Sequence, residues 1–174
     1  CKPGDFKYKD QNGDGVMNTE DKVFQGYKTP RYRWSMRNDF TIHKNFTVSF
    51  TMYSYFGHYG AFNEAANYNG GSPYKFSSYD LPRWTKDNPT NDYARISSYN
   101  AGTNWVKKSF LRLDNVSVSY NLPKSFLRKF AIQNMRLTLT ARNVAVLSPH
   151  WTFWDPENGS LSPRSFNLGI NFTL

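Results

Sequence analysis

Residues 46–56 read Phe-Thr-Val-Ser-Phe-Thr-Met-Tyr-Ser-Tyr-Phe, and their pattern is the clearest signal of the fold. Apolar and hydroxyl-bearing side chains alternate along it, the first set being Phe46, Val48, Phe50, Met52 and Phe56 and the second Thr47, Ser49, Thr51, Tyr53 and Tyr55. Successive side chains of a β-strand point to opposite faces, so a period of two predicts a strand with one apolar and one polar face.

Four further segments show the same alternation, namely residues 32–42, 110–122, 135–142 and 165–174. In the second of these, Leu111 and Leu113 are out of phase with Val116, and a bulge near Asp114 and Asn115 would bring the two halves onto one face. The five segments together predict an all-β fold of antiparallel strands.

The composition indicates where the apolar faces point. The chain has 174 residues, of which only 39% are apolar but 18% are aromatic. Soluble cores are rarely built this way, whereas transmembrane barrels combine an apolar band, aromatic girdles and a polar interior. No run of 18 apolar residues exists, so a spanning helix is excluded. We therefore expect Phe46, Val48, Phe50, Phe166, Leu168 and Ile170 to face lipid, and Thr47, Ser49, Asn167 and Asn171 to face the barrel interior.

The connections between the strands alternate in length, as they do in outer-membrane barrels with short periplasmic turns and long outside loops. Residues 43–45 form one short turn, and Pro123 opens a short helical turn in the other. The expected organisation is an extracellular loop (1–31), a strand hairpin (32–56), a long extracellular loop (57–108), a second hairpin (109–147) with a periplasmic turn (123–134), an extracellular loop (148–163) and a final strand (164–174).

Residues 10–21 have the spacing of a calcium loop. Oxygen-bearing side chains stand at its first, third, fifth, ninth and twelfth positions, with Gly15 at the sixth and the carbonyl of Val16 at the seventh; the side chains are those of Asp10, Asn12, Asp14, Asn18 and Asp21. The carboxylates would repel one another without a cation, which favours a structural calcium ion. The alternative is a metal-free turn whose Asx side chains bond the local backbone.

Several motifs resemble those that end the SusC/RagA family of TonB-dependent outer-membrane transporters. They occur in the family's order at residues 3–15, 109–123, 141–144, 154–157 and 163–172. The resemblance implies that residues 1–174 are the C-terminal five strands of a transmembrane barrel of about 22 strands. It also implies a longer parent protein whose N-terminal region carries the plug and the segment that contacts TonB.

The function that this resemblance implies is TonB-dependent uptake of a nutrient across the bacterial outer membrane. We expect an oligosaccharide as the cargo, with a peptide as the alternative, and a SusD-like surface lipoprotein as the partner. Lipid and the remainder of the parent barrel and plug would surround the chain. Five strands of a large barrel leave two open edges, so the segment is not expected to fold on its own.

The aromatic residues of the long loops are candidates for cargo contact, because sugar rings stack on flat aromatic faces. The candidates are Trp84, Trp105, Trp151, Trp154 and Tyr79. Alternatively, these side chains pack the loops on each other or lie at the membrane interface.

Other functions find less support. The net charge of +9 comes from scattered basic residues that form no run or stripe, so a nucleic-acid partner is not expected. No glycine-flanked serine, no HExxH motif and only one cysteine, Cys1, are present, so no catalytic residue is assigned and an enzyme is not expected. The alternatives are a calcium-dependent all-β carbohydrate-binding module and, third, an outer-membrane barrel enzyme. A dependence on detergent would separate the barrel from the module.

Overall fold

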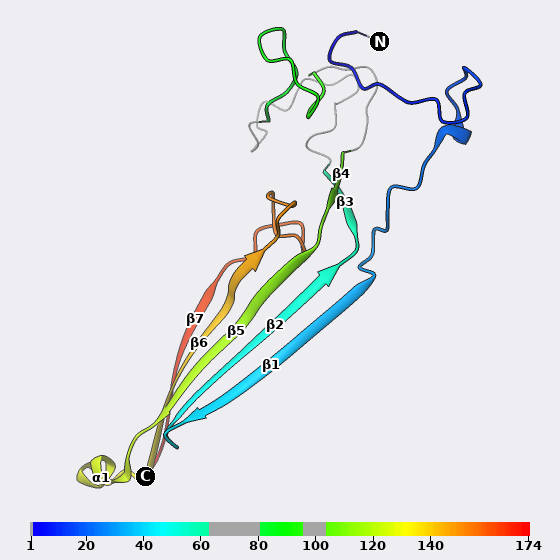
Figure 1. Ribbon diagram of the computed structural model, residues 1–174. Helices are drawn as coiled ribbons and strands as arrows, with labels where there is room; N and C mark the ends of the chain where they lie inside the picture. The colour runs from blue at the N-terminus through cyan, green and yellow to red at the C-terminus, as the bar shows by residue number, and fades with distance from the viewer. Residues whose placement is uncertain (1, 63–80, 96–103) are drawn as a thin grey trace. The chain divides into compact units, whose positions relative to one another are not determined.

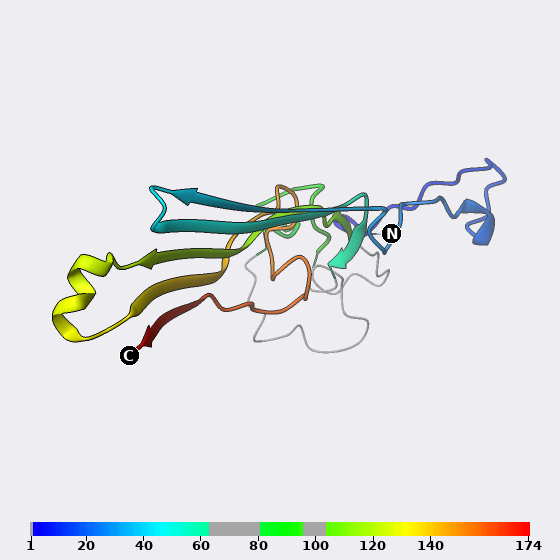
Figure 2. The same ribbon diagram turned by 90° about the horizontal axis from the view of Figure 1, so that it is seen from below.

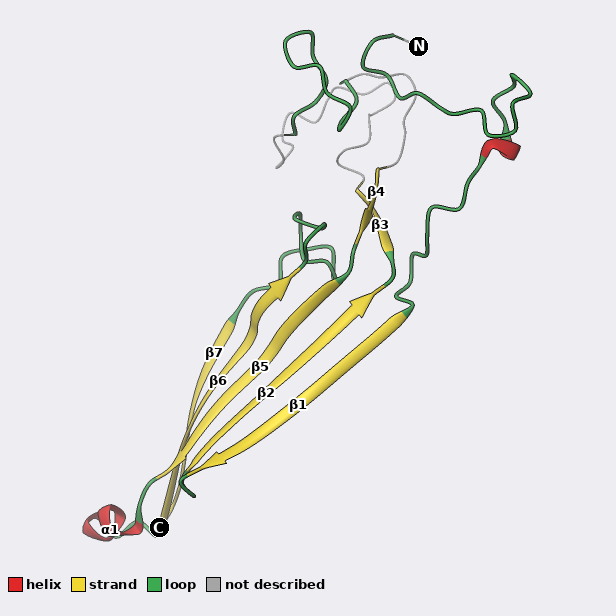
Figure 3. Cartoon of the chain, in the orientation of Figure 1, coloured by secondary structure: helices red, strands yellow, loops and turns green. Residues whose placement is uncertain are grey.

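The computed structural model describes residues 2–62, 81–95 and 104–174 (Figure 1). Its main element is one five-stranded antiparallel sheet in the order β1-β2-β5-β6-β7 (Figure 3). The strands are β1 (Tyr32–Ile42), β2 (Phe46–Phe56), β5 (Phe110–Asn121), β6 (Asn134–Leu147) and β7 (Ser165–Thr173). All five predicted strands are confirmed, and β6 continues five residues beyond the alternating segment that predicted it. The sheet is open in this chain, with β1 and β7 as its edges.

Two turns connect neighbouring strands at one end of this sheet. The β1–β2 hairpin turns through His43 and Lys44, both with positive φ (49° and 62°). Between β5 and β6 lie a four-residue helix, α1 (Lys124–Leu127), and a 3₁₀ turn (Arg128–Phe130), as the helical turn after Pro123 predicted. Figures 1 and 2 agree in placing α1 and the C-terminus at one end of the sheet, with residues 148–163 at the other.

The predicted bulge is present in the middle of β5. Leu113 pairs with Met52 and Asn115 with Thr51, so Asp114 has no partner residue on β2. On the other side, β6 also changes register at this point, because Leu113 pairs with Ala145 and Asn115 with Arg142. The bulge brings Leu113 onto the same face as Val116, which is the shift that its out-of-phase position required.

The cross-strand register gathers the apolar side chains on one face. One row across the sheet consists of Phe40, Val48, Val118, Leu139 and Leu168, and a neighbouring row consists of Phe50, Val116, Ala141 and Phe166. No other described helix or strand packs over these side chains, and Phe166 and Leu168 are each 72% exposed. The apolar set therefore forms no soluble-type core, and an exposed apolar face is what a lipid-facing barrel wall presents.

The opposite face is polar and better covered. Ser117 hydrogen-bonds Thr140 at 3.2 Å between their hydroxyl oxygens, and Ser119 hydrogen-bonds Thr138 at 3.0 Å. Ser119 is polar and nevertheless buried, which agrees with the better cover of this face. These two Ser–Thr pairs satisfy each other across β5 and β6, whereas the buried Oδ1 of Asn115 on the same face has no hydrogen-bond partner among the described residues.

Residues 2–26 and the described parts of 60–106 form a second compact unit. It includes a 3₁₀ turn (Thr19–Asp21) and an ion pair in which Arg95 Nε lies 2.7 Å from Asp5 Oδ1. Two short strands, β3 (Tyr59–Phe62) and β4 (Asn104–Lys107), pair in a separate two-stranded sheet. They lie at the two ends of the segment expected to be one long loop, and they were not predicted from the sequence. No helix among the described residues has the length and apolar character to cross a membrane.

Candidate functional site

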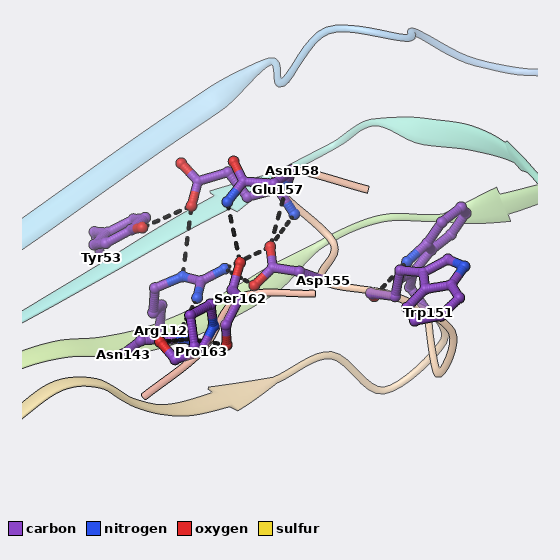
Figure 4. Close-up of polar contacts among 10 residues, drawn as sticks. Tyr53, Arg112, Asn143, Trp151, Asp155, Glu157, Asn158, Ser162 and Pro163 are labelled. Carbon is purple, nitrogen blue, oxygen red and sulfur yellow. Dashed lines mark hydrogen bonds and ion pairs between the residues drawn. The ribbon is translucent and has the colours of Figure 1, made fainter. Parts of the chain in front are cut away.

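Residues 148–163 fold over part of the polar face, and Arg112 of β5 is the centre of this contact (Figure 4). Arg112 is 3% exposed, and its Nη2 donates to both carboxylate oxygens of Asp155, at 2.8 and 2.7 Å. Its Nη1 donates to Oδ1 of Asn143 on β6. A buried guanidinium with this many charged and polar partners is a specific structural feature, since an unpaired charge here would be costly.

Asp155 also organises the tip of the loop around itself. Its Oδ1 accepts hydrogen bonds from the backbone N–H groups of Glu157 (2.9 Å) and Asn158 (3.2 Å). Its backbone carbonyl accepts from Gly159 N at 2.9 Å. Burial acts to raise the pKa of Asp155, but the hydrogen bonds from Arg112 and from these two N–H groups outweigh it and hold the pKa below its usual value. Asp155 is therefore a carboxylate at neutral pH.

Two further contacts attach the loop to the sheet. Glu157 Oε2 accepts a hydrogen bond from the Tyr53 hydroxyl at 2.7 Å and lies 3.5 Å from Arg112 Nε. Asn143, which has a positive φ of 51° beside the bulge, donates from Nδ2 to the carbonyl oxygen of Ser162 at 2.6 Å. Residues from β2, β5 and β6 thus contact both the tip and the end of the loop.

An aromatic wall continues along the same face beside this cluster. Phe110 is buried, and the ring centroids of Tyr53 and Tyr55 lie 6.0 and 5.4 Å from its own. The guanidinium carbon of Arg112 lies 5.5 Å from the Phe110 ring, and that of the exposed Arg33 lies 5.0 Å from the Tyr55 ring. Aromatic faces beside cations suit ligands that offer both a ring face and an acidic or hydroxylated group.

Of the five aromatic residues expected to contact cargo, the structure brings two into one loop. Trp151 is 8% exposed and donates from Nε1 to the carbonyl oxygen of Trp154 at 2.9 Å. Lys108 Nζ lies 4.9 Å from the Trp151 ring. Trp151 thus packs within the loop, in agreement with the alternative role for these side chains. Trp84 and Trp105 belong to the second unit, and Tyr79 lies outside the described residues. A cargo role for these residues stays a prediction.

The expected calcium loop is held by hydrogen bonds to its own backbone. Asp10 accepts from Gly13 N (2.6 Å) and Gly15 N (2.8 Å). The remaining members do the same with nearby N–H groups: Asn12 accepts from Asp14, Asp14 from Val16, Asn18 from Glu20, and Asp21 from Gln11 and Asn18.

This arrangement is the Asx network that was the alternative to a metal site. The N–H groups of Asn18 and Gln11 lower the pKa of Asp21. Within residues 2–62, 81–95 and 104–174 no three His, Cys, Asp or Glu side chains converge in a way that could hold a metal. The oxygen-rich residue types still suit a hard cation, and calcium stays a prediction.

The pairing of Arg112 with Asp155 was not predicted from the sequence. A usable signal existed, because residues 115–154 contain no Asp or Glu. An arginine on the polar face of a strand needs an acidic partner when it is buried, and Asp155 is the first acidic residue after Asp114.

Comparisons with known proteins agree with this geometry. No protein-family model matches the chain. TonB-dependent receptors P26 and P3 of Formosa agariphila are each 28% identical to it over 98% of its length, which is 20% and 17% of their own. The chain therefore spans about a fifth of the length of these curated relatives.

Solved structures of the RagAB peptide importer have the same fold. The "open-open" state matches 96% of this chain and 20% of its own, with a TM-score of 0.69 and 20% identity. A second structure, that of the RagAB peptide transporter, matches 74% of this chain and 16% of its own, with a TM-score of 0.54 and 22% identity. The resemblance to SusC/RagA-type TonB-dependent transporters is thus confirmed: the sheet of this chain matches an open part of such a barrel, and its location is the outer membrane.

Proposed function

We propose that the parent protein imports a nutrient across the outer membrane in a TonB-dependent manner, and that this chain is part of the barrel wall. The observation that carries the proposal is the division of one sheet into two faces. Apolar residues such as Leu168 are exposed on one face, while Arg112 and Asp155 are buried on the other under residues 148–163. That inversion of polarity suits a wall with lipid outside and a polar interior.

The polar face supplies the chemistry for cargo contact. Tyr55 and Arg33 continue the aromatic wall past the loop, and both lie on the face that would line the barrel interior. Tyrosine faces stack on sugar rings, and an exposed guanidinium binds carboxylates. We infer an oligosaccharide as the cargo, and an acidic one fits this pair best.

A peptide is the second candidate. RagAB, whose structures this chain resembles, is a peptide importer, and a peptide carboxylate would suit Arg33 as well as an acidic sugar does. The two candidates differ in what Tyr55 contributes, because stacking on a sugar ring needs its aromatic face and binding a terminal carboxylate does not.

The partners follow from the resemblance. We infer a SusD-like surface lipoprotein at the end of the sheet where residues 148–163 lie, and contact with TonB through parts of the parent outside residues 1–174. A calcium ion bound by residues 10–21 would have a structural role. Co-purification of a lipoprotein with the tagged parent protein from detergent-solubilised membranes tests the first of these inferences.

The experiment for cargo is an uptake assay in cells that express the parent protein, with and without TonB, supplied with labelled acidic oligosaccharides, neutral oligosaccharides or peptides. We expect accumulation only with TonB, and we expect Tyr55→Ala to reduce oligosaccharide uptake more than Tyr55→Phe does. Equal loss in both variants would argue against stacking. If only peptides are taken up, the cargo is a peptide and not an oligosaccharide. Recovery of cleaved cargo in the medium would favour an enzyme.

A further inference from the structure

The turn between β5 and β6 presents two aromatic rings to its surroundings. Phe126 and Phe130 are 51% and 60% exposed, and their ring centroids lie 5.5 Å apart. A single exposed apolar residue is common on protein surfaces, but adjacent exposed rings form a patch, and exposed apolar patches mark interaction surfaces.

The turn is well formed. Leu127, between the two rings in sequence, is 1% exposed, and its carbonyl oxygen accepts a hydrogen bond from Ile132 N at 3.3 Å. The carbonyl oxygen of Pro123 accepts from Phe126 N at 3.1 Å, and Ala131 ends the turn with a positive φ of 54°. The exposure of the rings is therefore a consequence of a defined backbone, which directs Leu127 inward and its neighbours outward.

The same turn is strongly basic. Lys124, Arg128 and Lys129 are all exposed, and no acidic residue occurs anywhere between Asp114 and Asp155 in the sequence to neutralise them locally. Three cations around two exposed aromatic rings match the chemistry of an anionic phospholipid surface, where rings lie at the level of the headgroups and cations bind their phosphates.

The position of the turn agrees with that partner. The apolar face of the sheet extends to this end, where Met135 pairs with Phe172, and Phe172 is exposed. Figures 1 and 3 show α1 just beyond the strand ends. Aromatic residues flank the apolar band of outer-membrane barrels at this level.

We propose that residues 123–130 form an anchor that docks on anionic phospholipid, with Phe126 and Phe130 inserted among the headgroups and Lys124, Arg128 and Lys129 bound to phosphate groups. The inference rests on the outer-membrane location and is independent of the cargo. By binding phospholipid, the turn holds the end of the barrel that is expected to be periplasmic at the membrane surface.

The test uses the full-length parent protein, with other cysteines removed, spin-labelled at Phe126→Cys and reconstituted into bilayers of phosphatidylcholine with or without phosphatidylglycerol. Electron paramagnetic resonance measures how readily the label collides with oxygen, which enriches in lipid, and with a water-soluble nickel chelate. With phosphatidylglycerol we expect several-fold fewer nickel collisions than oxygen collisions. In the triple variant Lys124→Gln/Arg128→Gln/Lys129→Gln, the ratio of nickel to oxygen collisions should be the same in bilayers with and without phosphatidylglycerol.

A charge-matched control replaces the exposed Lys7, Lys9 and Lys22 by Gln, and it should behave as the unmodified protein does. Heat-modifiable migration on gels checks that every variant has a folded barrel. A label that collides freely with nickel in both bilayers would overturn the proposal, because the turn would then lie in water. A label shielded from both reagents would also overturn it, because a protein surface would then cover the turn.

Discussion

Replacing Arg112 by methionine is expected to release residues 148–163 from the polar face of the sheet. Methionine keeps much of the length of the arginine side chain but leaves the carboxylate of Asp155 buried without its cation. Removing one partner of a buried ion pair costs about 3 to 5 kcal/mol. Because the loop can move outward and rehydrate Asp155, we expect the lower end, about 3 kcal/mol, to be lost from docking of the loop.

That magnitude corresponds to a roughly 150-fold increase in the population of the released loop. Amide hydrogen exchange of the full-length protein in detergent measures it directly. The N–H groups of Glu157, Asn158 and Gly159, which bond Asp155, should lose protection by that factor. The ladder between β5 and β6 should keep its protection, since strand pairing does not depend on the loop.

Two further variants separate the effect of an unpaired buried charge from that of lost packing and of an exposed ion pair. Arg112→Met/Asp155→Asn removes both charges, and we expect it to recover much of the protection that Arg112→Met loses. Arg37→Met breaks an ion pair whose side chains are 70% and 52% exposed, so it should change nothing measurable. Full protection of the loop amides in Arg112→Met would show that the buried pair does not hold the loop. A double variant as unprotected as the single one would show that the cost is lost packing, not an unpaired charge.

Four other outcomes are expected. The pKa of Asp155 is lower in the folded state, so its contribution to docking of the loop is complete above the unfolded pKa of about 4 and is lost as the pH falls through the lower folded value. Pepsin cleavage of residues 148–163 across this pH range measures the loss of docking. Asp155→Asn should weaken the pH dependence of cleavage. Calorimetry on the full-length protein should show calcium binding that Asp14→Ala removes while the barrel stays folded, and no binding at millimolar calcium would contradict the site. Gly4→Ala should expose residues 2–26 to proteolysis more than Gly13→Ala does, since both have positive φ but only at Gly4 would a Cβ lie 2.5 Å from the Trp84 ring. Residues 1–174 produced alone should need detergent, and a soluble, cooperatively folding monomer would contradict the barrel assignment.

The strands could be predicted because each has two chemically different faces. In β2 every second residue from Phe46 to Met52 is apolar, and a one-residue shift in register would have placed that set on the polar side. The bulge was predictable for the same reason, since Leu113 and Val116 can share a face only if one residue between them is unpaired. Period-two patterns encode faces and register, and the structure follows them closely.

The loop contacts could not be predicted in the same way. Nothing local in residues 148–163 states that Asp155 reaches Arg112, because the pair is separated by 43 positions and depends on the register of two strands. The short strands β3 and β4 were missed because four residues are too few to show a period. For the aromatic residues, sequence alone did not distinguish a packed Trp151 from an exposed Trp105.

The sheet inverts the usual relation between polarity and burial, and that inversion determines which substitutions matter. Leu168 is exposed and Arg112 is buried, so shortening Leu168 to alanine opens no cavity, whereas shortening Arg112 leaves a charge unpaired. An apolar face of this kind gains its stability from lipid, and the unpaired edges of β1 and β7 must gain theirs from neighbouring strands. The contacts internal to this chain therefore include buried polar pairs such as Arg112–Asp155 beside buried apolar side chains such as Phe110.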